Sequence, residues 1–301
     1  MTRKYRYYQI DSFTKEKFSG NPAGVITNAD GLNAEEMQKI ARELNNSETA
    51  FIFSSSENTY DVEVRFFTPI KEVPVCGHAT IAAHYARAIE KDMGTTRIYQ
   101  KTGAGILPVD ILKENDDYRI IMTQGKIEFG EILAGETLDS ILSALKLRHK
   151  DLLENYSVQI VSTGHSKVLI GIKSRENLNR LLPDSSRLAE ISKDIQCNGY
   201  YVFTIDTNSD ILVHGRMFAP AIGITEDPVT GNANGPLGAY LVYYRKVNST
   251  GSQFNFRAMQ GEAIHRTGTM DVQVKIKNEE PYEVKISGKA IVAFQSEILL
   301  A

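Results

Sequence analysis

A repeated pattern constrains the fold of this chain more than any other feature of its sequence. The run Arg65–Pro69 (RFFTP) recurs as Arg216–Pro220 (RMFAP). Each run leads through a short loop into a glycine turn, Cys76–Thr80 (CGHAT) in the first copy and Thr230–Asn234 (TGNAN) in the second. An apolar helix is expected after each turn. The shared order of strand, loop, glycine turn and helix predicts a duplicated structural unit.

The two helices that follow these turns are expected to be buried. Gly77–Glu90 and Gly235–Tyr244 lack the wide polar face of a surface helix. Short runs such as Val62–Phe67 alternate apolar and polar residues, as half-buried antiparallel strands do. By contrast, Ala34–Leu44 has an apolar stripe and Asn33 as a helix cap, which predicts a surface helix. We therefore predict an α+β fold of two pseudo-symmetric domains, each a barrel-like antiparallel sheet around a central helix.

The chain length and its two ends indicate how these domains are built. A chain of 301 residues suits two domains. Because the first strand and the last stretch both need partners, the chain is expected to cross between domains near residues 124 and 285. We predict an N-terminal domain of residues 1–124, to which residues 285–301 return, and a C-terminal domain of residues 125–284. The active site is expected in the cleft between them.

Composition and spacing exclude several classes of function. A net charge of -3 gives no electrostatic basis for binding nucleic acid or an anionic membrane. Neither a membrane span nor a signal-peptide core is found. Two cysteines, Cys76 and Cys197, make no disulfide framework, so a cytoplasmic location is expected. Histidines and cysteines lack metal-binding spacing, and no nucleotide fingerprint is present, so neither metal nor cofactor is expected. Long sheet edges make a homodimer the expected assembly.

Both glycine turns are candidate anion sites. The N-terminus of a helix presents unpaired N–H groups and a partial positive charge, which suit a carboxylate. Gly77 and His78 lie at one such end, and Gly231 and Asn232 at the other, with Asp227 close by in sequence. A glycine turn also begins many ordinary helices. The occurrence of two matched turns nevertheless favours a site for a small carboxylate-bearing substrate.

Glu48 and Cys76 are the candidate proton carriers. Glu48 follows a helix and precedes an apolar strand, where partial burial would suit a general acid/base; the alternative is a solvated turn residue. A thiol beside a helix N-terminus ionises readily, so Cys76 is a possible auxiliary group. A paired-thiol mechanism is disfavoured because the repeat places Thr230 where a second thiol would stand. Cys197 lies too far along the chain to replace it.

Several motifs resemble those of the phenazine-biosynthesis F (PhzF) isomerase family, and together they span nearly the whole chain. They are Asp11–Phe13, Phe18–Val25, Ser47–Phe51, Glu72–Thr80 and Glu226–Ala233. The resemblance is closest to an uncharacterised bacterial branch that carries Thr-Gly-Asn-Ala-Asn. It implies a fold like that of diaminopimelate epimerase and a cofactor-free reaction in the interdomain cleft.

The resemblance also implies roles for individual residues. Glu48 matches the glutamate that transfers the proton, and Gly77, His78 and Asp227 match residues that line the site. Asn21 is a weaker candidate for substrate contact. Asn232 stands where the phenazine enzyme has a serine, so the contact there is expected to differ, which puts the phenazine substrate in doubt.

The sequence thus predicts a cofactor-independent isomerase that moves a proton on a small carboxylate-bearing metabolite. The substrate carboxylate would bind the two helix ends, and Glu48 would remove and return the proton. One alternative is a racemase or epimerase in which Cys76 and Glu48 act on opposite faces of the substrate. Another is a protein that binds small carboxylates without catalysis, and a purely structural homodimer is the least favoured.

Overall fold

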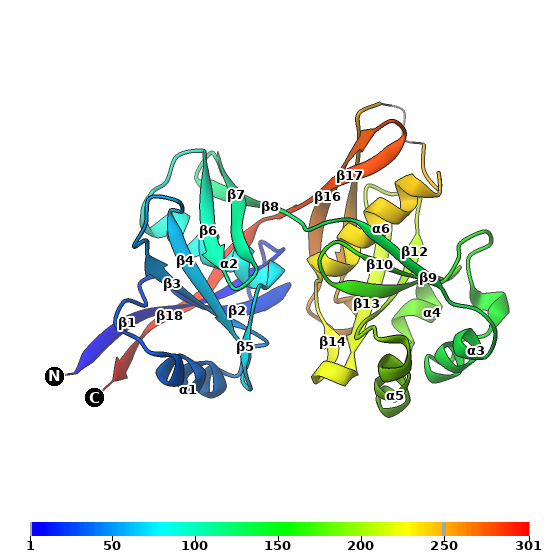
Figure 1. Cartoon of the computed structure of the whole chain (residues 1–301), viewed down its shortest axis with the longest axis horizontal. Coiled ribbons are helices and arrows are strands. Elements are labelled where there is room, and N and C mark those ends of the chain that lie inside the picture. The colour runs from blue at the N-terminus through cyan, green and yellow to red at the C-terminus, as the bar shows by residue number, and fades with distance from the viewer. Residues whose placement is uncertain (1, 249–250, 301) are drawn as a thin grey trace. The chain divides into compact units, whose positions relative to one another are not determined.

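The computed structural model describes residues 2–248 and 251–300, and the chain divides into two compact units (Figure 1). Unit 1 comprises Met1–Thr123 and Ser287–Ala301, and unit 2 comprises Gln124–Ile286. The chain therefore leaves unit 1 after Thr123 and returns to it after Ile286. Sequence reasoning expected these crossings near residues 124 and 285.

Unit 1 contains two helices and a sheet built from both ends of the chain. Its elements are β1 (Arg3–Ser12), β2 (Asn21–Ile26), α1 (Ala34–Leu44), β3 (Thr49–Ser54), β4 (Val62–Phe67), β5 (Glu72–Val73), α2 (Gly77–Glu90), β6 (Thr96–Thr102), β7 (Gly105–Glu114), β8 (Asp117–Thr123) and β18 (Ala290–Leu300).

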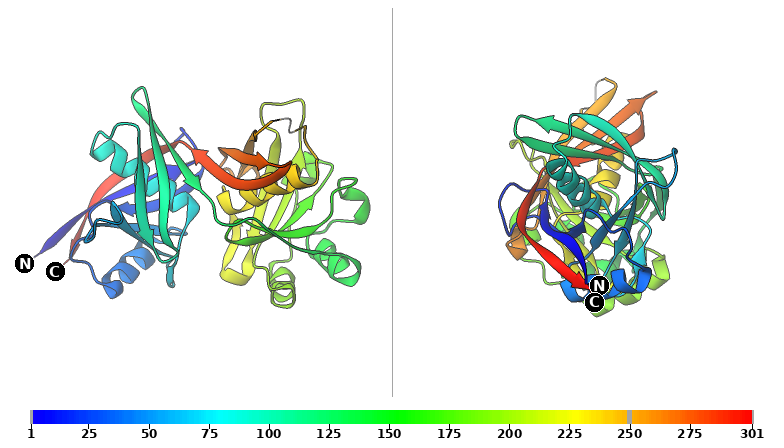
Figure 2. Two further views of the ribbon diagram at one scale, coloured as in Figure 1. Left: turned by 45° about the horizontal axis from the view of Figure 1, so that its top comes forward. Right: turned by 90° about the vertical axis from the view of Figure 1, so that its left-hand side faces the viewer.

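The first and last strands of the chain lie side by side. β1 pairs antiparallel with β18 along its whole length, from Arg3 opposite Leu300 to Ser12 opposite Ala290. Both views of Figure 2 show the two termini together at one end of this pair. β1 also pairs antiparallel with β2. The last strand of the chain thus completes the sheet of unit 1.

Helix α2 is the buried helix of unit 1. Its fourteen residues include eleven that are buried, and it packs against β1, β2, β3 and β8. Alanine at five positions allows this close approach on all sides of the helix. Helix α1, in contrast, buries only one face, which includes Met37, Ile40 and Ala41. The predicted capping box of Asn33 and Glu36 is present, and α1 begins and ends where the sequence predicted.

Unit 2 contains a second sheet with its own buried helix. Its elements are β9 (Glu128–Ile132), α3 (Gly135–Ala144), η1 (His149–Asp151), β10 (Gln159–Ser162), β11 (Ser166–Gly171), α4 (Arg175–Asn179), α5 (Ser185–Ile195), β12 (Tyr200–Ile205), β13 (Val213–Ala219), η2 (Pro220–Ile222), β14 (Ile224–Asp227), α6 (Gly231–Tyr243), β15 (Gln253–Gln260), η3 (Glu262–Ile264), β16 (Gly268–Lys277) and β17 (Glu280–Gly288), which runs two residues past the boundary.

The strand pairing of unit 2 repeats that of unit 1. In unit 1, β2–β3 is parallel, β3–β4 antiparallel, β4–β5 antiparallel and β4–β6 parallel. In unit 2, β11–β12 is parallel, β12–β13 antiparallel, β13–β14 antiparallel and β13–β15 parallel. Helix α6 is buried at eleven of its thirteen residues and packs on β10, β11 and β16. The predicted pair of pseudo-symmetric α+β units around central helices is confirmed.

Two details differ from the sequence-based expectation. Each sheet is mixed rather than wholly antiparallel, because α1 and α2 in unit 1 are crossovers that bring the chain back in the same direction. Helix α6 begins at Gly231, not at Gly235, and so contains Pro236 within its second turn. A proline disfavours helical geometry in the residue before it, which is why the sequence suggested a later start.

Among the described residues, no helix is long and apolar enough to cross a membrane.

Candidate functional site

The N-terminus of α2 is the first part of the candidate site. Cys76 is the N-cap residue, and its carbonyl oxygen accepts hydrogen bonds from the Thr80 N–H at 3.0 Å and from the Thr80 hydroxyl at 2.7 Å. The N–H groups of Gly77, His78 and Ala79 precede this first helical bond. They therefore have no acceptor within the helix, and N–H groups in this position suit the oxygen atoms of a ligand.

His78 links three polar side chains at this helix end. Its side chain is only 7% exposed. The Nδ1 atom lies 3.5 Å from Cys76 Sγ, and Nε2 lies 3.2 Å from Ser47 Oγ. The His78 carbonyl oxygen accepts a hydrogen bond from the Ser12 hydroxyl at 2.9 Å, which ties the helix start to β1. The imidazole is therefore fixed from both ring nitrogens and from the backbone.

Glu48 lies beside the same imidazole, on the loop between α1 and β3. Asn46 anchors this loop to β1 through paired amide bonds with Gln9, of 2.8 and 3.0 Å. On the other side, the Glu48 carbonyl oxygen accepts from the Gly24 N–H of β2 at 3.2 Å. Because both sides of the loop are held by strands, the Glu48 side chain has a defined position on a rigid support.

The Glu48 carboxylate is the least satisfied polar group of this cluster. Its side chain is 13% exposed, and its Oε2 atom lies 3.3 Å from His78 Nε2. This contact lacks the angles of a hydrogen bond, so Oε2 is buried without a hydrogen-bond partner among the described residues. A buried carboxylate oxygen of this kind is costly to the protein. It therefore points to a partner that arrives with a ligand.

Glu48, Cys76 and His78 are also the described residues that could hold a metal ion. One ligand atom from each lies within 4.8 Å of the others. Carboxylate, thiolate and imidazole are donors that Zn²⁺ accepts. However, both ring nitrogens of His78 already contact Ser47 or Cys76, and an ion would displace one of these contacts.

Asn21 lies close to this cluster along β2. It is fully buried as the first residue of the strand and stands opposite Ser12 of β1. Ser12 in turn donates to the His78 carbonyl oxygen. Asn21 is thus one strand away from the start of α2, within the same unit as Glu48, Cys76, Gly77 and His78.

The N-terminus of α6 is the corresponding part of unit 2. Asn234 takes the place of Thr80: its amide nitrogen donates to the N-cap carbonyl of Thr230 at 3.1 Å. Asn234 also donates to Gln260 Oε1 at 2.7 Å and accepts from the Tyr201 hydroxyl at 2.6 Å. Gln260 Oε1 further accepts the Thr230 N–H at 3.0 Å. This buried network holds the turn from β15 and β12.

Asp227 ends β14 and is buried beside this turn. The Thr230 hydroxyl donates to its Oδ2 atom, which orients the carboxylate toward the helix start. Glu226, the residue before it, forms a bidentate ion pair with Arg216 of β13, with N–O distances of 2.9 and 2.6 Å. Since this pair is almost fully buried, it fixes the strand on which Asp227 lies.

Asn232 and Gly231 occupy the first turn of α6. The Asn232 Oδ1 atom accepts from Gln124 Nε2 at 3.1 Å, and the Thr163 hydroxyl donates to Gln124 Oε1 at 2.7 Å. A Cβ atom at Gly235 would lie 1.6 Å from Gln124 Oε1, so only glycine admits this glutamine beside the helix. The amide of Asn232 is therefore oriented by unit 2 itself.

The structure thus brings the candidate residues together in two groups, one in each unit. Asn21, Glu48, Cys76, Gly77 and His78 gather around the start of α2, and Asp227, Gly231 and Asn232 around the start of α6. Sequence reasoning did not identify the residues that support them, namely Ser47, Gln124 and Gln260. Ser47 could have been found as the neighbour of Glu48. Gln124 and Gln260 lie far in sequence from the residues they support, and no motif around them marks that role.

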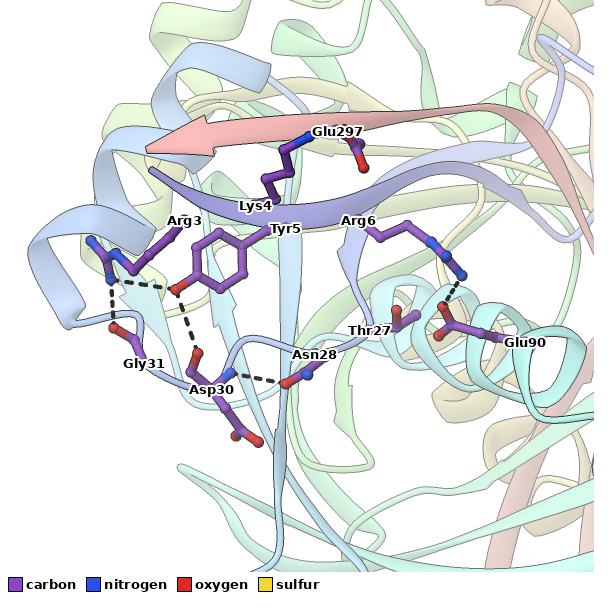
Figure 3. A pocket seen from close by; sticks show the side chains of 10 residues that line it. All are labelled: Arg3, Lys4, Tyr5, Arg6, Thr27, Asn28, Asp30, Gly31, Glu90 and Glu297. Atoms are coloured by element: carbon purple, nitrogen blue, oxygen red, sulfur yellow. Dashed lines mark hydrogen bonds and ion pairs between the residues drawn. The ribbon is translucent and has the colours of Figure 1, made fainter. Parts of the chain in front are cut away.

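A separate hollow of about 570 Å³ lies at the other end of unit 1 (Figure 3). It is lined by Arg3, Lys4, Tyr5, Arg6, Thr27, Asn28, Asp30, Gly31, Glu90 and Glu297. Glu90 ends α2, twelve residues after His78, so at about 1.5 Å per residue the hollow is remote from the candidate site. Its arginines are already paired, Arg3 with Glu36 and Arg6 with Glu90.

Comparison with known proteins gives consistent matches over nearly the whole chain. Residues 10–296 match the family model described as phenazine biosynthesis-like protein. An uncharacterised isomerase of Clostridium acetobutylicum is 68% identical over the full length of both chains. A trans-2,3-dihydro-3-hydroxyanthranilate isomerase of Pseudomonas aeruginosa is 29% identical over 94% of this chain and 95% of that protein.

Among solved structures, a phenazine biosynthesis protein of the PhzF family from Bacillus anthracis superposes with a TM-score of 0.89. It is 31% identical in sequence, and the match covers 99% of this chain and 100% of that one.

Proposed function

Because this chain belongs to the phenazine biosynthesis-like protein family, we propose that it moves a proton on a small carboxylate-bearing metabolite, with Glu48 as the acid/base. The chain is an isomerase, as its relatives are.

The buried Glu48 Oε2 atom is the observation that carries this proposal. It has no hydrogen-bond partner among the described residues, although it lies 3.3 Å from His78 Nε2. A carboxylate held on a rigid loop without a partner can take a proton from a bound carbon acid without first breaking an existing bond.

The reaction then needs two proton transfers and no other reactant. The Glu48 carboxylate removes a proton from an activated C–H group, and the electron pair left behind delocalises into the neighbouring unsaturated system of the substrate. Glu48, now a carboxylic acid, returns the proton to a different carbon. The net change is the movement of one proton and one double bond, so atoms and electrons balance and Glu48 regains its starting form.

Substrate binding is assigned to both helix N-termini. The N–H groups of Gly77 and His78 in unit 1, and of Gly231 and Asn232 in unit 2, are suited to carboxylate oxygens. Asp227, oriented by Thr230, would bind a donor group of the substrate.

The family also suggests the kind of substrate. The relative in Pseudomonas aeruginosa is named for a dihydro-hydroxyanthranilate, which carries a ring carboxylate. In this chain Asn232 presents an amide whose oxygen is bound by Gln124. The amide nitrogen is the donor that this side chain could offer a ligand, which favours a substrate with an acceptor at that position.

Mass spectrometry of hydrogen exchange tests the proposal directly. Candidate carboxylate metabolites are incubated with the protein in D₂O and examined for incorporated deuterium. Exchange into one metabolite is expected with the native protein, and Glu48→Gln should lower its rate by about 10²–10⁴-fold. Glu16→Gln, an exposed carboxylate on the loop between β1 and β2, is the matched control and should exchange at the native rate.

Deuterium exchange at the native rate in Glu48→Gln would show that Glu48 is not the proton carrier. If metabolites bind and none exchanges, the chain is instead a carboxylate-binding protein.

A racemase or epimerase assisted by Cys76 is the second candidate. The contact between Cys76 Sγ and His78 Nδ1 at 3.5 Å favours it, because an imidazole next to a thiol promotes its ionisation. In that reaction Cys76 and Glu48 would act on opposite faces of one carbon, so their reacting atoms, now within 4.8 Å of each other, would have to move apart to admit it. Cys76→Ala should then abolish exchange together with inversion of the substrate's configuration. Unchanged exchange in Cys76→Ala would leave Glu48 as the proton carrier.

The homodimer and the cytoplasmic location stay predictions. Analytical ultracentrifugation measures the first, and fractionation of cells that produce the protein measures the second.

A further inference from the structure

Lys167 lies on the face of the unit 2 sheet that α6 covers. It is a residue of β11, two positions before Leu169, so both side chains point to the same face. Leu169 is paired with Tyr201 of β12, whose hydroxyl bonds to Asn234 in the first turns of α6 at 2.6 Å. The Lys167 side chain therefore projects toward the helix and away from the outer face of the sheet.

The register also places Lys167 at the N-terminal end of that helix. Tyr201 of β12 contacts Asn234 near the start of α6. Farther along, the ring of Tyr156 contacts both Phe203 of β12 and Tyr240 of α6. Hence β12 runs in the direction of α6, and β11 is parallel to β12. Because Lys167 precedes Leu169, it lies beyond the first turn of α6, where the helix N–H groups point.

Gly199 directs the side chain across the sheet. A Cβ atom at Gly199 would lie 2.4 Å from Lys167 Cδ and 2.8 Å from Cε, so the lysine stem crosses the glycine. The strands beyond Gly199 in this sheet are β13 and β14, and β14 ends at Asp227. The stem thus points to the side of the sheet on which Asp227 lies.

Charges around the ammonium agree with this placement. Burial is the largest influence and lowers the pKa of Lys167, while the nearby Cys197 and Asp227 raise it. His165, on the turn before β11, has its pKa lowered by burial and then by Lys167. A buried cation gains from an anionic ligand, because the ligand's charge offsets the loss of water around the ammonium.

We propose that the Lys167 ammonium binds the substrate carboxylate together with the N–H groups at the start of α6, and so makes a negative charge a requirement for substrates. This inference rests on the proposed function, which assigns a carboxylate to that helix end. The Ser166 carbonyl oxygen accepts one of the three ammonium hydrogens at 3.0 Å, so the ammonium has further hydrogens to donate to a ligand oxygen.

Calorimetric titration with benzoate and with benzamide tests the requirement for charge. Both probes have the same ring, and only benzoate carries a negative charge. Lys167→Met keeps the apolar stem across Gly199 and should weaken benzoate binding at least tenfold while leaving benzamide binding unchanged. Lys167→Arg restores the charge and should recover most of the benzoate affinity. Lys173→Met removes an exposed lysine just past the same strand and is the control.

Equal benzoate affinity in native protein and Lys167→Met would overturn the inference, as would a native protein that binds benzamide and not benzoate. Thermal unfolding of each variant establishes that it is folded.

The outcome for Lys167 is distinguishable from that for Glu48. Glu48→Gln should bind benzoate normally while deuterium exchange fails. Exchange that needs Glu48 and proceeds normally in Lys167→Met overturns only the role of Lys167. Benzoate binding that needs Lys167, in a protein that exchanges no carboxylate, overturns only the proton transfer.

Discussion

The two copies of the repeat use the same ion pair in opposite environments. In unit 1, Arg65 of β4 forms a bidentate pair with Glu72 of β5, with both N–O distances 2.7 Å. In unit 2, Arg216 of β13 pairs in the same way with Glu226 of β14. The side chains of the first pair are 28% and 43% exposed, and those of the second 7% and 8%. The same ion pair is thus buried in unit 2 and partly exposed to solvent in unit 1.

The same divergence is visible at the helix starts. Thr80 and Asn234 bond to the N-cap carbonyl of their own helix in the same way. Around this shared frame, unit 1 has the ionisable side chains Cys76, His78 and Glu48, whereas unit 2 has Asn232 and Asp227, supported by amides and hydroxyls. Under the proposed function, unit 1 would carry the proton transfer and unit 2 would hold a polar group of the substrate.

The largest expected loss of stability follows removal of the buried guanidinium. Arg216→Met leaves the Glu226 charge buried and frees the Leu178 and Leu181 carbonyl oxygens, which now accept from Arg216 at 3.0 and 2.9 Å. We expect the free energy of unfolding to fall by about 3–5 kcal/mol, measured by chemical denaturation. Combining this change with Glu226→Gln should recover part of the loss. A loss below about 1 kcal/mol would mean that the ion pairs of Arg216 and Arg65 contribute equally little to stability.

Acid sensitivity should distinguish the two buried helices. In α2, His84 is fully buried and bonds to Gln100 at 2.8 Å. Burial lowers the pKa of His84 from 6.5 to about 4, against the effect of that bond. Between pH 6.5 and about pH 4, His84 is protonated in the unfolded chain and neutral in the folded chain. The contribution of neutral His84 to the free energy of unfolding is therefore fully present above pH 6.5. It falls by up to about 1.4 kcal/mol per pH unit as the pH drops toward 4.

His84→Gln removes this titration and keeps a polar group for Gln100. The free energy of unfolding is measured at pH 7 and pH 4.5, and the difference should be smaller in the variant than in the native protein. The position in α6 that matches His84 is Gly238, which does not titrate. An unchanged pH dependence in His84→Gln would locate the acid sensitivity elsewhere.

Removal of one glutamine should weaken the α6 turn specifically. Gln260→Leu leaves the Thr230 N–H and one amide hydrogen of Asn234 without their acceptor. Buried donors that lose a partner cost about 1–3 kcal/mol, so this variant should unfold more easily and exchange its α6 backbone hydrogens faster. Hydrogen exchange with mass spectrometry measures both units in one experiment. Faster exchange in α2 alone would contradict the assignment.

The smallest effect is expected from the exposed counterpart of Arg216. Arg65→Met breaks a pair that water already screens, so the loss should be about 0–1 kcal/mol by the same denaturation measurement. A loss as large as that of Arg216→Met would show that exposure does not explain the difference between the two copies.

Much of this architecture could be predicted because it is local. Asn33 and Glu36 fix the start of α1 through contacts within four residues, and the repeat of Arg65–Pro69 revealed the duplication. The start of α6 could not be predicted, because Gly235 and Pro236 look like a turn until Gln124, more than a hundred residues away, packs against the glycine. The site divides in the same way. Glu48 and His78 lie in recognisable sequence motifs and could be predicted. The positions of Ser47, Gln260 and Lys167 depend on tertiary packing and could not.

The pairing of β1 with β18 has a consequence for synthesis on the ribosome. The whole of unit 2 is encoded between two parts of unit 1, and every strand within its boundaries emerges before β18 does. Domains fold as units while the chain grows. Unit 2 can therefore complete its sheet while unit 1 still lacks its last strand, and one edge of β1 stays unpaired until β18 leaves the exit tunnel. The emergence of β18, rather than that of the Glu48 loop, is then the event that completes the sheet of unit 1.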